Sequence, residues 1–250
     1  MSKTIFITGG TGTVGKQLVK NFIDDDCVVI TTSRSKETKE KLLKEINSSL
    51  LHVIEVDLSF KDSYSIISDY LLKNNLHPSV LINNARNKEN LIITDNLHIS
   101  DQKWLDEYFL DVVVPYKLIT SFALDKKIPL RRVINISSIY GIVAQNPMLY
   151  ENPSISLAPQ YGAAKSALIQ LTKDLAVQLA KMNITINAVS FGGIKTNNSA
   201  EFLKRYSEIV PLRRMMDISE VFGIIQMLAG EESSYITGQN FIIDGGFSAW

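Results

Sequence analysis

The sequence predicts an α/β protein built on one parallel, doubly wound sheet of about seven strands. Short runs of apolar and β-branched residues recur along the chain, and an amphipathic stretch of helical length separates each run from the next. Strands that alternate with helices in this way form parallel sheets, and helices cover both faces of such sheets. No linker, repeat or low-complexity segment interrupts the alternation in the 250 residues. We therefore expect a single domain that spans residues 1–250.

The expected strands are apolar, rich in Val, Ile and Thr, and short. In chain order they are 4–8 (TIFIT), 27–32 (CVVITT), 50–56 (LLHVIEV), 79–83 (SVLIN), 131–137 (RRVINIS), 184–190 (ITINAVS) and 240–243 (NFII). The expected helices fill the intervals and mix apolar with charged residues, as surface helices do. In chain order they lie at about 14–24, 36–47, 61–73, 100–124, 159–181, 198–208 and 218–229. Two stretches are expected to be irregular, 84–99 and 141–158, and long loops in a compact domain are usually functional or disordered.

Composition and charge exclude several classes of protein. Lys and Arg balance Asp and Glu, 26 against 26, so no basic field is available to attract nucleic acid. The single cysteine, Cys27, excludes an internal disulfide framework, and it opens a strand, where a small buried hydrophobe is expected. No signal peptide and no apolar run of membrane-spanning length is visible. We expect a cytoplasmic protein with neither nucleic acid nor a membrane as its partner.

The first strand ends in the glycine-rich turn TGGTGTVG, and a helix follows. Gly9, Gly12 and Gly15 in this place let the backbone approach a pyrophosphate, which then sits at the helix N-terminus. The turn is completed by Thr11, Thr13 and Val14. The spacing departs from the common G-x-G-x-x-G and by itself is equally compatible with a tight structural turn. Its position after the first strand favours a dinucleotide.

The end of the second strand indicates which dinucleotide is bound. NAD-binding folds usually place an acid there for the ribose 2′-hydroxyl, but this chain has Ser33 and Arg34, and no carboxylate before Glu37. The planar guanidinium of Arg34 can pair with a 2′-phosphate. NADP(H) is therefore favoured. NAD(H) stays possible, because Arg34 is otherwise a solvated charge that opens the next helix.

Tyr161 and Lys165, in the motif YGAAK, are the candidate catalytic pair. They lie near the start of the expected helix 159–181, where residues four apart share a face. A lysine cation beside a phenol stabilises the phenolate, which makes Tyr161 a candidate general acid for a carbonyl oxygen, or a base for the reverse oxidation. On its own the pattern is more often a core tyrosine beside a surface lysine.

Further motifs follow one another in a fixed order along the chain. They are Asp57-Leu58 after the third strand, NNA at 83–85, NISS at 135–138, YGAAK at 161–165, INAVSFGGIKT at 186–196 and ITGQNFIIDGG at 236–246. With the glycine turn, they make the chain resemble the short-chain dehydrogenase/reductase family over essentially its whole length. The resemblance implies a Rossmann fold and hydride transfer between a nicotinamide cofactor and an alcohol/carbonyl pair. The loop between NISS and YGAAK is similar to that of family members that modify flagellin or surface glycans.

The resemblance also implies a role for each matching residue. Ser138 would hydrogen-bond the substrate carbonyl, Tyr161 would donate the proton, and Lys165 would hold the nicotinamide ribose. Contacts to the cofactor would come from Asp57, Leu58, Asn83, Ile194 and Thr196, with the neighbouring Asn84, Ala85 and Gly192. No metal is expected.

Four positions depart from the family pattern. Thr13 replaces a glycine of the turn, Arg86 replaces the glycine usual after NNA, and Phe191 replaces a proline. Asp111 falls at the position of an asparagine that supports a water-linked proton path to the lysine. An aspartate keeps the shape of that side chain and adds charge, so Asp111 is carried as a candidate member of the catalytic group.

Ser138 and Tyr161 are 23 positions apart, farther than in the usual family pattern. A surface loop lengthens at little entropic cost, so the two side chains are expected to share one site. The ligand crevice of this fold lies at the carboxyl ends of the strands. Residues 145–157 are therefore predicted to form a wall of the substrate pocket, with Tyr150 and Glu151 as polar contacts. The alternative is an interface or surface loop.

The loop resemblance suggests a polar sugar derivative as the substrate, which is an argument by analogy. Residues 197–216 stand where the family has its mobile substrate flap, and four cations there are candidates for binding a sugar phosphate. They are Lys204, Arg205, Arg213 and Arg214. The alternative is a solvated helix face followed by a salt-bridged turn.

Two other functions compete with that of an NADP(H)-dependent oxidoreductase. Asp111 and Arg86 suggest a redox-silent, nucleotide-binding regulator, although the intact Ser138, Tyr161 and Lys165 argue against it. The glycine spacing suggests a sugar-nucleotide epimerase or dehydratase, but such enzymes carry a larger lobe than the residues after DGG provide. A homo-oligomer, dimer or tetramer, is expected by resemblance, through the two long helices and the C-terminal strand.

Overall fold

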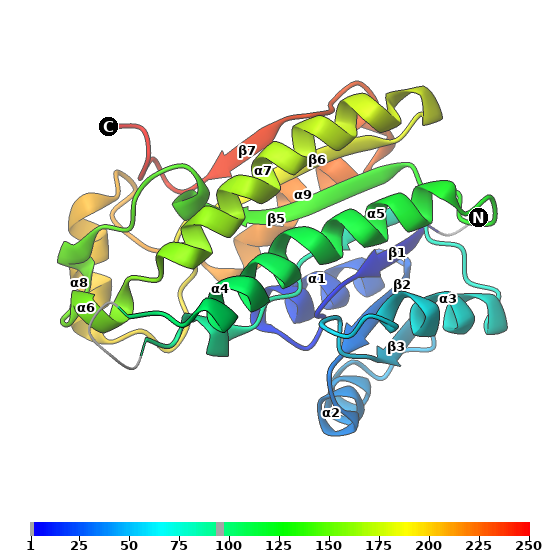
Figure 1. Cartoon of the computed structure of the whole chain (residues 1–250), viewed down its shortest axis with the longest axis horizontal. Helices are drawn as coiled ribbons and strands as arrows, with labels where there is room; N and C mark the ends of the chain where they lie inside the picture. Colours follow the sequence, from blue (N-terminus) through cyan, green and yellow to red (C-terminus); the bar gives the residue numbers. More distant parts are fainter. Residues whose placement is uncertain (1–2, 94–97) are drawn as a thin grey trace.

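The computed structural model describes residues 3–93 and 98–250 and contains one seven-stranded sheet with the order β3-β2-β1-β4-β5-β6-β7 (Figure 1). Every neighbouring pair of strands is parallel. The strands are β1 Thr4–Ile7, β2 Val28–Ser33, β3 Leu51–Glu55, β4 Val80–Asn83, β5 Arg132–Ser138, β6 Thr185–Phe191 and β7 Asn240–Ile243. All seven predicted strands are confirmed. The strand order reverses at β1, so a crevice opens between the loops after β1 and β4.

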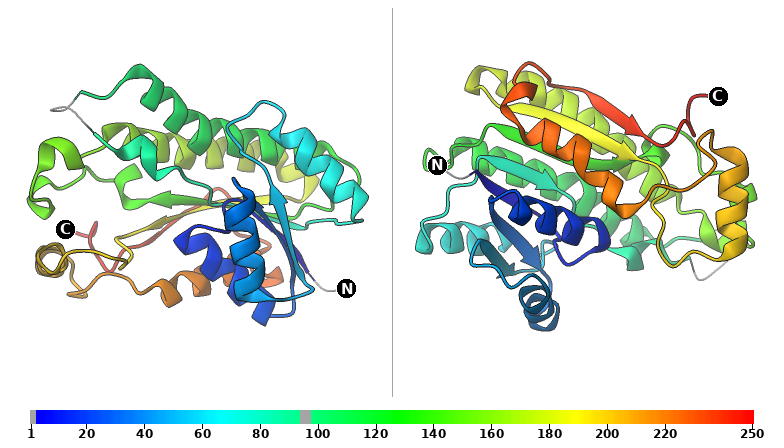
Figure 2. Two further views of the ribbon diagram at one scale, coloured as in Figure 1. Left: turned by 90° about the horizontal axis from the view of Figure 1, so that it is seen from below. Right: turned by 180° about the vertical axis from the view of Figure 1, so that it is seen from behind.

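Helices cover both faces of the sheet because successive side chains of a strand point to opposite faces. Ile5 and Ile7 of β1 pack with helices α1 (Thr13–Asp24), α2 (Lys36–Ile46) and α9 (Phe222–Ala229). Phe6, between them, packs on the other face with α3 (Ser63–Lys73), α5 (Val114–Leu124) and α7 (Pro159–Leu179). Figure 2 shows α5 and α7 on one side of the sheet, and α1 and α9 on the other. The doubly wound α/β fold is therefore confirmed.

The predicted helix 100–124 is in fact two helices. Helix α4 (Asp101–Tyr108) passes through a π-helical turn, Phe109–Val113, into α5. Pro115 explains the change, because it has no N–H to donate to the carbonyl of Asp111 and its ring would clash with that carbonyl in a regular helix. The wider turn accommodates the proline. It also places Asp111 in the interior of the protein.

The two stretches expected to be irregular contain short helical turns. Residues 88–91 form a 3₁₀ turn, and residues 94–97 of the first stretch lie outside the described residues. The second stretch holds a 3₁₀ turn at Pro147–Leu149 and a short helix, α6 (Pro153–Ser156). A proline opens each of these elements and also α7, a position that needs no backbone N–H. The helix that follows β6 is α8 (Ala200–Ile209). Over the described residues, no helix is long and apolar enough to cross a membrane.

Candidate active site

A cleft of about 1190 Å³ runs across the carboxyl ends of the strands, which point to the left in Figure 1. Gly9 and Arg34 line one end of the cleft, Ser138 and Tyr161 its middle, and Phe202 of α8 the other end. The cleft thus joins the predicted cofactor-binding turn to the predicted catalytic residues. It continues as far as the helix that follows β6.

The glycine turn is shaped to leave backbone N–H groups open to the cleft. Gly9 has φ +70°, and a Cβ atom there would lie 2.8 Å from the Cα of Ala85. A Cβ atom at Gly15 would lie 2.2 Å from the carbonyl oxygen of Gly9, so neither position accepts a larger residue. Gly12 caps α1 without a side-chain hydrogen bond, which leaves the first amides of the helix available to an anion. Thr11, Thr13 and Val14 line the same end of the cleft.

Two threonines of β2, which the sequence analysis missed, hold this turn in place. The hydroxyl of Thr32 accepts a hydrogen bond from the N–H of Gly9 at 2.9 Å. The hydroxyl of Thr31 accepts one from the N–H of Gly10 at 2.9 Å and donates to the carbonyl of Ile7 at 2.6 Å. Both residues belong to the run CVVITT, which by itself indicates only a buried strand.

At the end of β2, the two candidate residues differ in orientation. Arg34 is exposed and lines the cleft together with Thr38. Ser33 is buried outside the cleft, because its hydroxyl pairs with that of Thr38 at 2.7 Å, within the first turn of α2. Glu37 is exposed and does not line the cleft. The cleft therefore meets a guanidinium here and no carboxylate of α2.

Residues after β3, β4 and β6 also border the cleft. Asp57 lines the cleft, and its carboxylate accepts hydrogen bonds from the N–H and hydroxyl of Ser59, at 2.9 and 2.7 Å. Leu58 borders the cleft while most of its side chain packs in the core. The other predicted cofactor-binding residues on the cleft are Ala85, Gly192, Ile194 and Thr196.

The two asparagines of NNA face in different directions. Asn84 lines the cleft, and its side-chain amide donates to the carbonyls of Thr8 and Gly9, so it fixes the glycine turn. Asn83 is the last residue of β4 and points into the layer of helices, where it donates to Asn135 Oδ1 at 2.8 Å. Asn83 therefore lies outside the main cleft, in contrast to the predicted ribose contact. The alternation of side chains along a strand accounts for the difference.

Ser138 and Tyr161 lie in one site despite the long loop between them. Strand β5 ends at Ser138, and Tyr161 is in the first turn of α7, which packs along β5. The hydroxyl of Ser137 donates to the carbonyl of Lys165 at 3.2 Å, and Asn135 donates to the hydroxyl of Thr172 at 2.9 Å. These bonds fix strand and helix together independently of the loop.

Lys165 is buried behind Tyr161. Its ammonium lies 3.0 Å from Asp111 Oδ2 and donates to the carbonyl of Ile136 at 3.1 Å. The side chains of Lys165 and Asp111 are only 7% and 1% exposed. The contact with Asp111 has the distance of an ion pair but not the angle of a hydrogen bond. The Lys165 ammonium also lies 5.8 Å from the centre of the Tyr161 ring.

A second cation adjoins the tyrosine. The guanidinium carbon of Arg86 lies 4.6 Å from the centre of the Tyr161 ring, a distance typical of a cation–π contact. Tyr140 packs against the same ring edge-on, at 6.5 Å between ring centres. Arg86 therefore stands in the cleft beside the predicted proton donor, as its place after NNA suggests.

Three buried polar residues near Lys165 were not predicted. They are Glu107 of α4, Asn90 of the loop after β4, and Gln160 at the start of α7. Glu107 accepts a hydrogen bond from Asn90 Nδ2 at 3.0 Å. Burial, and then the charge of Asp111, raise the pKa of Glu107 to about 7, against the opposing effects of Asn90, Lys165 and Arg86. The only signal in the sequence was the spacing of Glu107, four residues before Asp111.

Among the described side chains of the long loop, one borders the cleft. Tyr150 lines it, with its hydroxyl 3.2 Å from that of Tyr140 and its ring 5.6 Å from that of Phe202. Glu151 is exposed and lies outside the cleft. Leu149 is buried in the small apolar cluster beneath α8, which holds the loop in place.

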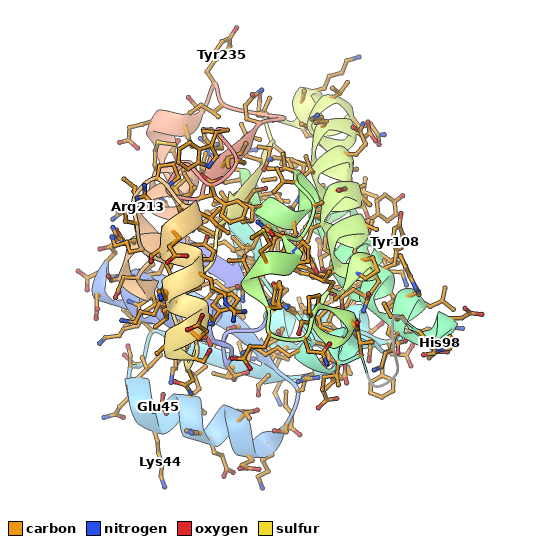
Figure 3. All side chains as sticks on the ribbon, turned by 90° about the vertical axis from the view of Figure 1, so that its left-hand side faces the viewer. Lys44, Glu45, His98, Tyr108, Arg213 and Tyr235 are labelled. Carbon is orange, nitrogen blue, oxygen red and sulfur yellow. The ribbon has the colours of Figure 1, made fainter. Side chains whose placement is uncertain are left out.

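None of the four predicted cations of region 197–216 lines the cleft. Arg205 pairs with Glu201 at 3.1 Å, and Arg214 pairs with Glu220 at 2.6 Å. Arg213 donates to the carbonyl of Glu208 and lies at the outer edge of the molecule (Figure 3). The structure matches the alternative of a solvated helix face followed by a salt-bridged turn.

Comparison with known proteins agrees with this geometry. A family model described as enoyl-(acyl carrier protein) reductase matches residues 10–248. The post-translational flagellin modification protein A of Campylobacter coli is 24% identical, over 98% of each chain. A 3-oxoacyl-(acyl-carrier-protein) reductase of Aquifex aeolicus is 28% identical, over 98% of this chain and 96% of the reductase. A Leptospira borgpetersenii short-chain dehydrogenase, whose crystal structure contains bound NAD⁺, is 28% identical, with a TM-score of 0.88. The match covers 99% of this chain and 93% of the dehydrogenase chain.

Fold and site together define an NAD(P)-dependent oxidoreductase on a Rossmann-like sheet. The chain belongs to the short-chain dehydrogenase/reductase family.

Proposed function

We propose that this protein interconverts an alcohol and a carbonyl with NADP(H), and that Tyr161 is the group that gives or takes the proton. The observation that carries the proposal is the grouping of Ser138, Tyr161 and Lys165 in one cleft, with Lys165 buried against Asp111. A phenol beside an ammonium has the donor and the charge stabilisation that a developing alkoxide requires.

The cofactor fits the cleft by the chemistry of its lining. The open N-terminus of α1 and the close approach of backbone at Gly9 suit a diphosphate. Arg34 suits a 2′-phosphate, and the absence of Glu37 from the cleft removes the carboxylate that would repel it. The nicotinamide, when bound, supplies or accepts the hydride. Preference for NADP(H) over NAD(H) rests on Arg34.

Each catalytic side chain has a separate task. Ser138 ends β5 and lines the cleft, and its hydroxyl, which accepts a hydrogen bond from the N–H of Tyr140, still has its O–H to donate to the substrate oxygen. Tyr161 transfers the proton at that oxygen. Lys165 stabilises the phenolate while Asp111 balances its charge. None of these steps draws on the long loop, which leaves it available for substrate recognition.

We further propose a small, polar substrate, and a sugar derivative is the class that the loop suggests. Tyr150 offers a hydroxyl at the substrate end of the cleft. The exposed guanidinium of Arg86, beside Tyr161, favours a substrate with a carboxylate or phosphate near its reacting carbon. The protein is proposed to be cytoplasmic. Exposed apolar side chains on α4, α5 and α7, such as Leu105, Leu124 and Val177, support a homo-oligomer.

The test is turnover, with cofactor binding as a separate measurement. Purified protein is titrated with NADPH and NADH by nicotinamide fluorescence, and then assayed at 340 nm against keto sugars, sugar phosphates, keto acids and simple ketones. We expect turnover that falls about 10²–10⁴-fold in Tyr161→Phe, while NADPH affinity changes little. Tight NADPH binding without turnover on any compound would favour the redox-silent regulator. Binding of neither nucleotide would contradict the proposal.

A further inference from the structure

Glu107 is a buried acid with too few partners for a carboxylate. The residue is 1% exposed, on the face of α4 that packs against α7. Its Oε2 accepts one hydrogen bond, from Asn90 Nδ2 at 3.0 Å. Its Oε1 has no partner among the described residues. An ionised carboxylate accepts several hydrogen bonds, and burying it without them is costly.

Asn90 links Glu107 to the start of α7. Gln160, also 1% exposed, donates from Nε2 to the carbonyl of Asn90 at 2.9 Å. Gln160 immediately precedes Tyr161, so the chain Glu107–Asn90–Gln160 fixes the turn that presents the proton donor. The Oε1 of Gln160 is a second buried acceptor without a donor in the described part of the chain. An ionised Glu107 has no hydrogen to donate to this network, whereas the neutral acid has one O–H donor.

The charges around Glu107 also favour the neutral acid. The π turn contributes Asp111, α7 contributes Lys165, and the loop after β4 contributes Arg86. The buried ammonium of Lys165 is already paired with Asp111 at 3.0 Å. Arg86 is exposed and lies over the Tyr161 ring, where solvent screens its charge. If Glu107 and Asp111 were both ionised, the buried cluster of Glu107, Asp111 and Lys165 would carry one uncompensated negative charge.

We propose that Glu107 holds a proton in the working enzyme, so that Asp111 is the ionised partner of Lys165 and the neutral acid fixes the start of α7 through Asn90 and Gln160. Glu107 is thus a positioning residue, which acts on Tyr161 and Lys165 through its neighbours. Loss of its proton adds a second negative charge beside Asp111 and competes for Lys165. The effect on turnover rests on the proposed function; the protonation of Glu107 does not.

The proton is tested without a substrate. Infrared difference spectra between about pH 5 and about pH 9 report the C=O stretch of a carboxylic acid that ionises in this range. We expect such a band in the wild-type protein and in Glu40→Gln, a matched change on the exposed face of α2, and its loss in Glu107→Gln. A band that persists unchanged in Glu107→Gln would overturn the proposal.

A measurement on the unaltered protein covers the case in which Glu107→Gln does not fold. Carbon NMR of protein labelled at glutamate carboxyls follows each titration, and we expect one glutamate with a pKa of about 7 rather than near the usual value of 4.5. Titration of every glutamate in the usual range would overturn the proposal.

The consequence for catalysis appears in the pH profile of kcat. The amide of Glu107→Gln mimics the neutral acid, so we expect activity close to wild type at about pH 6 and a ratio of variant to wild type that rises at least threefold by about pH 8.5. A folded, cofactor-binding Glu107→Gln that is inactive at every pH would show that a carboxylate is needed there, against the proposal. If the wild-type protein turns over no substrate, the proposed function fails. The infrared and NMR results still decide whether Glu107 is protonated.

Discussion

Lys165 Nζ lies 3.0 Å from Asp111 Oδ2, and both side chains are almost completely buried. Desolvation disfavours a buried ammonium unless an opposite charge or strong acceptors surround it. Here the ammonium has the carboxylate of Asp111 and the carbonyl of Ile136, at 3.1 Å. Asp111 therefore gives the lysine a direct counter-ion.

Removing this counter-ion is expected to destabilise the protein strongly. Asp111→Ala leaves a buried cation without its partner, so the free energy of unfolding should fall by about 3–5 kcal/mol. Asp111→Asn keeps a polar side chain of the same shape and should cost about 1–3 kcal/mol. The measurement is urea unfolding at neutral pH. As a control, Glu201→Ala breaks the exposed pair with Arg205 and should cost less than about 1 kcal/mol. Equal losses for the two alanine variants would contradict this account.

The sheet and the juxtaposition of Tyr161 with Lys165 were predictable because their signals are local. An apolar, β-branched run reads as a buried strand without reference to the rest of the chain, and the strands from β1 to β7 were found in this way. Tyr161 and Lys165 are one helical turn apart, so helix geometry alone brings them to one face. The order of motifs then placed Ser138 and Asp57 at the same edge of the sheet.

The remainder of the site depends on contacts between distant segments. Glu107, Asn90 and Gln160 come from three separate elements, and no spacing in the chain joins them. The π turn at Phe109–Val113 follows from Pro115, yet the periodicity of 100–124 predicts one uninterrupted helix. Asn83 and Ser33 lie in motifs that border the cleft, but hydrogen bonds to Asn135 and Thr38 turn their side chains inward.

Arg34 is expected to determine the choice of nicotinamide cofactor. It is the exposed cation at the end of β2 that lines the cleft, and a charge-assisted hydrogen bond contributes about 1.5–3 kcal/mol. Arg34→Ala should therefore raise the Kd for NADPH by about 10–150-fold and change the Kd for NADH by less than about threefold. Both constants are measured by fluorescence titration. Arg213→Ala, at the outer edge of the molecule, is the matched control. Equal losses for NADPH and NADH in Arg34→Ala would show that this side chain does not contact a 2′-phosphate.

Tyr150 is expected to affect substrate binding and not cofactor binding. Its ring packs on Phe202 at the α8 end of the cleft, and its hydroxyl faces that of Tyr140. Tyr150→Ala opens this wall and should raise the KM for the substrate about 5–30-fold, from the loss of about 1–2 kcal/mol of contact, with the Kd for NADPH unchanged. Tyr150→Phe removes the hydroxyl alone, so it separates the contribution of the hydroxyl from that of the ring. Met148→Ala, in the same loop but 77% exposed, should leave KM as it is. An unchanged KM in Tyr150→Ala would identify the loop as a surface or interface loop.

Glu107 is expected to make the stability of the fold decrease as pH rises. In the unfolded chain Glu107 ionises at its ordinary pKa of 4.5, whereas in the folded protein burial and Asp111 raise the pKa to about 7. The folded state therefore binds more protons between these two values, so the free energy of unfolding falls as pH rises through this window. At about 1.4 kcal/mol for each tenfold change in proton affinity, the full loss above the window is about 3 kcal/mol.

Glu107→Gln removes the ionisable group and should remove this loss. We expect the variant to exceed the wild type by about 2–3 kcal/mol in free energy of unfolding at about pH 8, and to show no gain below about pH 4.5. Urea unfolding across this range measures the difference, and Glu40→Gln should follow the wild type at every pH because Glu40 is exposed on α2. A difference between Glu107→Gln and wild type that stays constant with pH would mean that Glu107 has the same pKa in the folded and the unfolded protein. The acid would then be ionised at neutral pH, and Lys165 would balance two buried carboxylates rather than one.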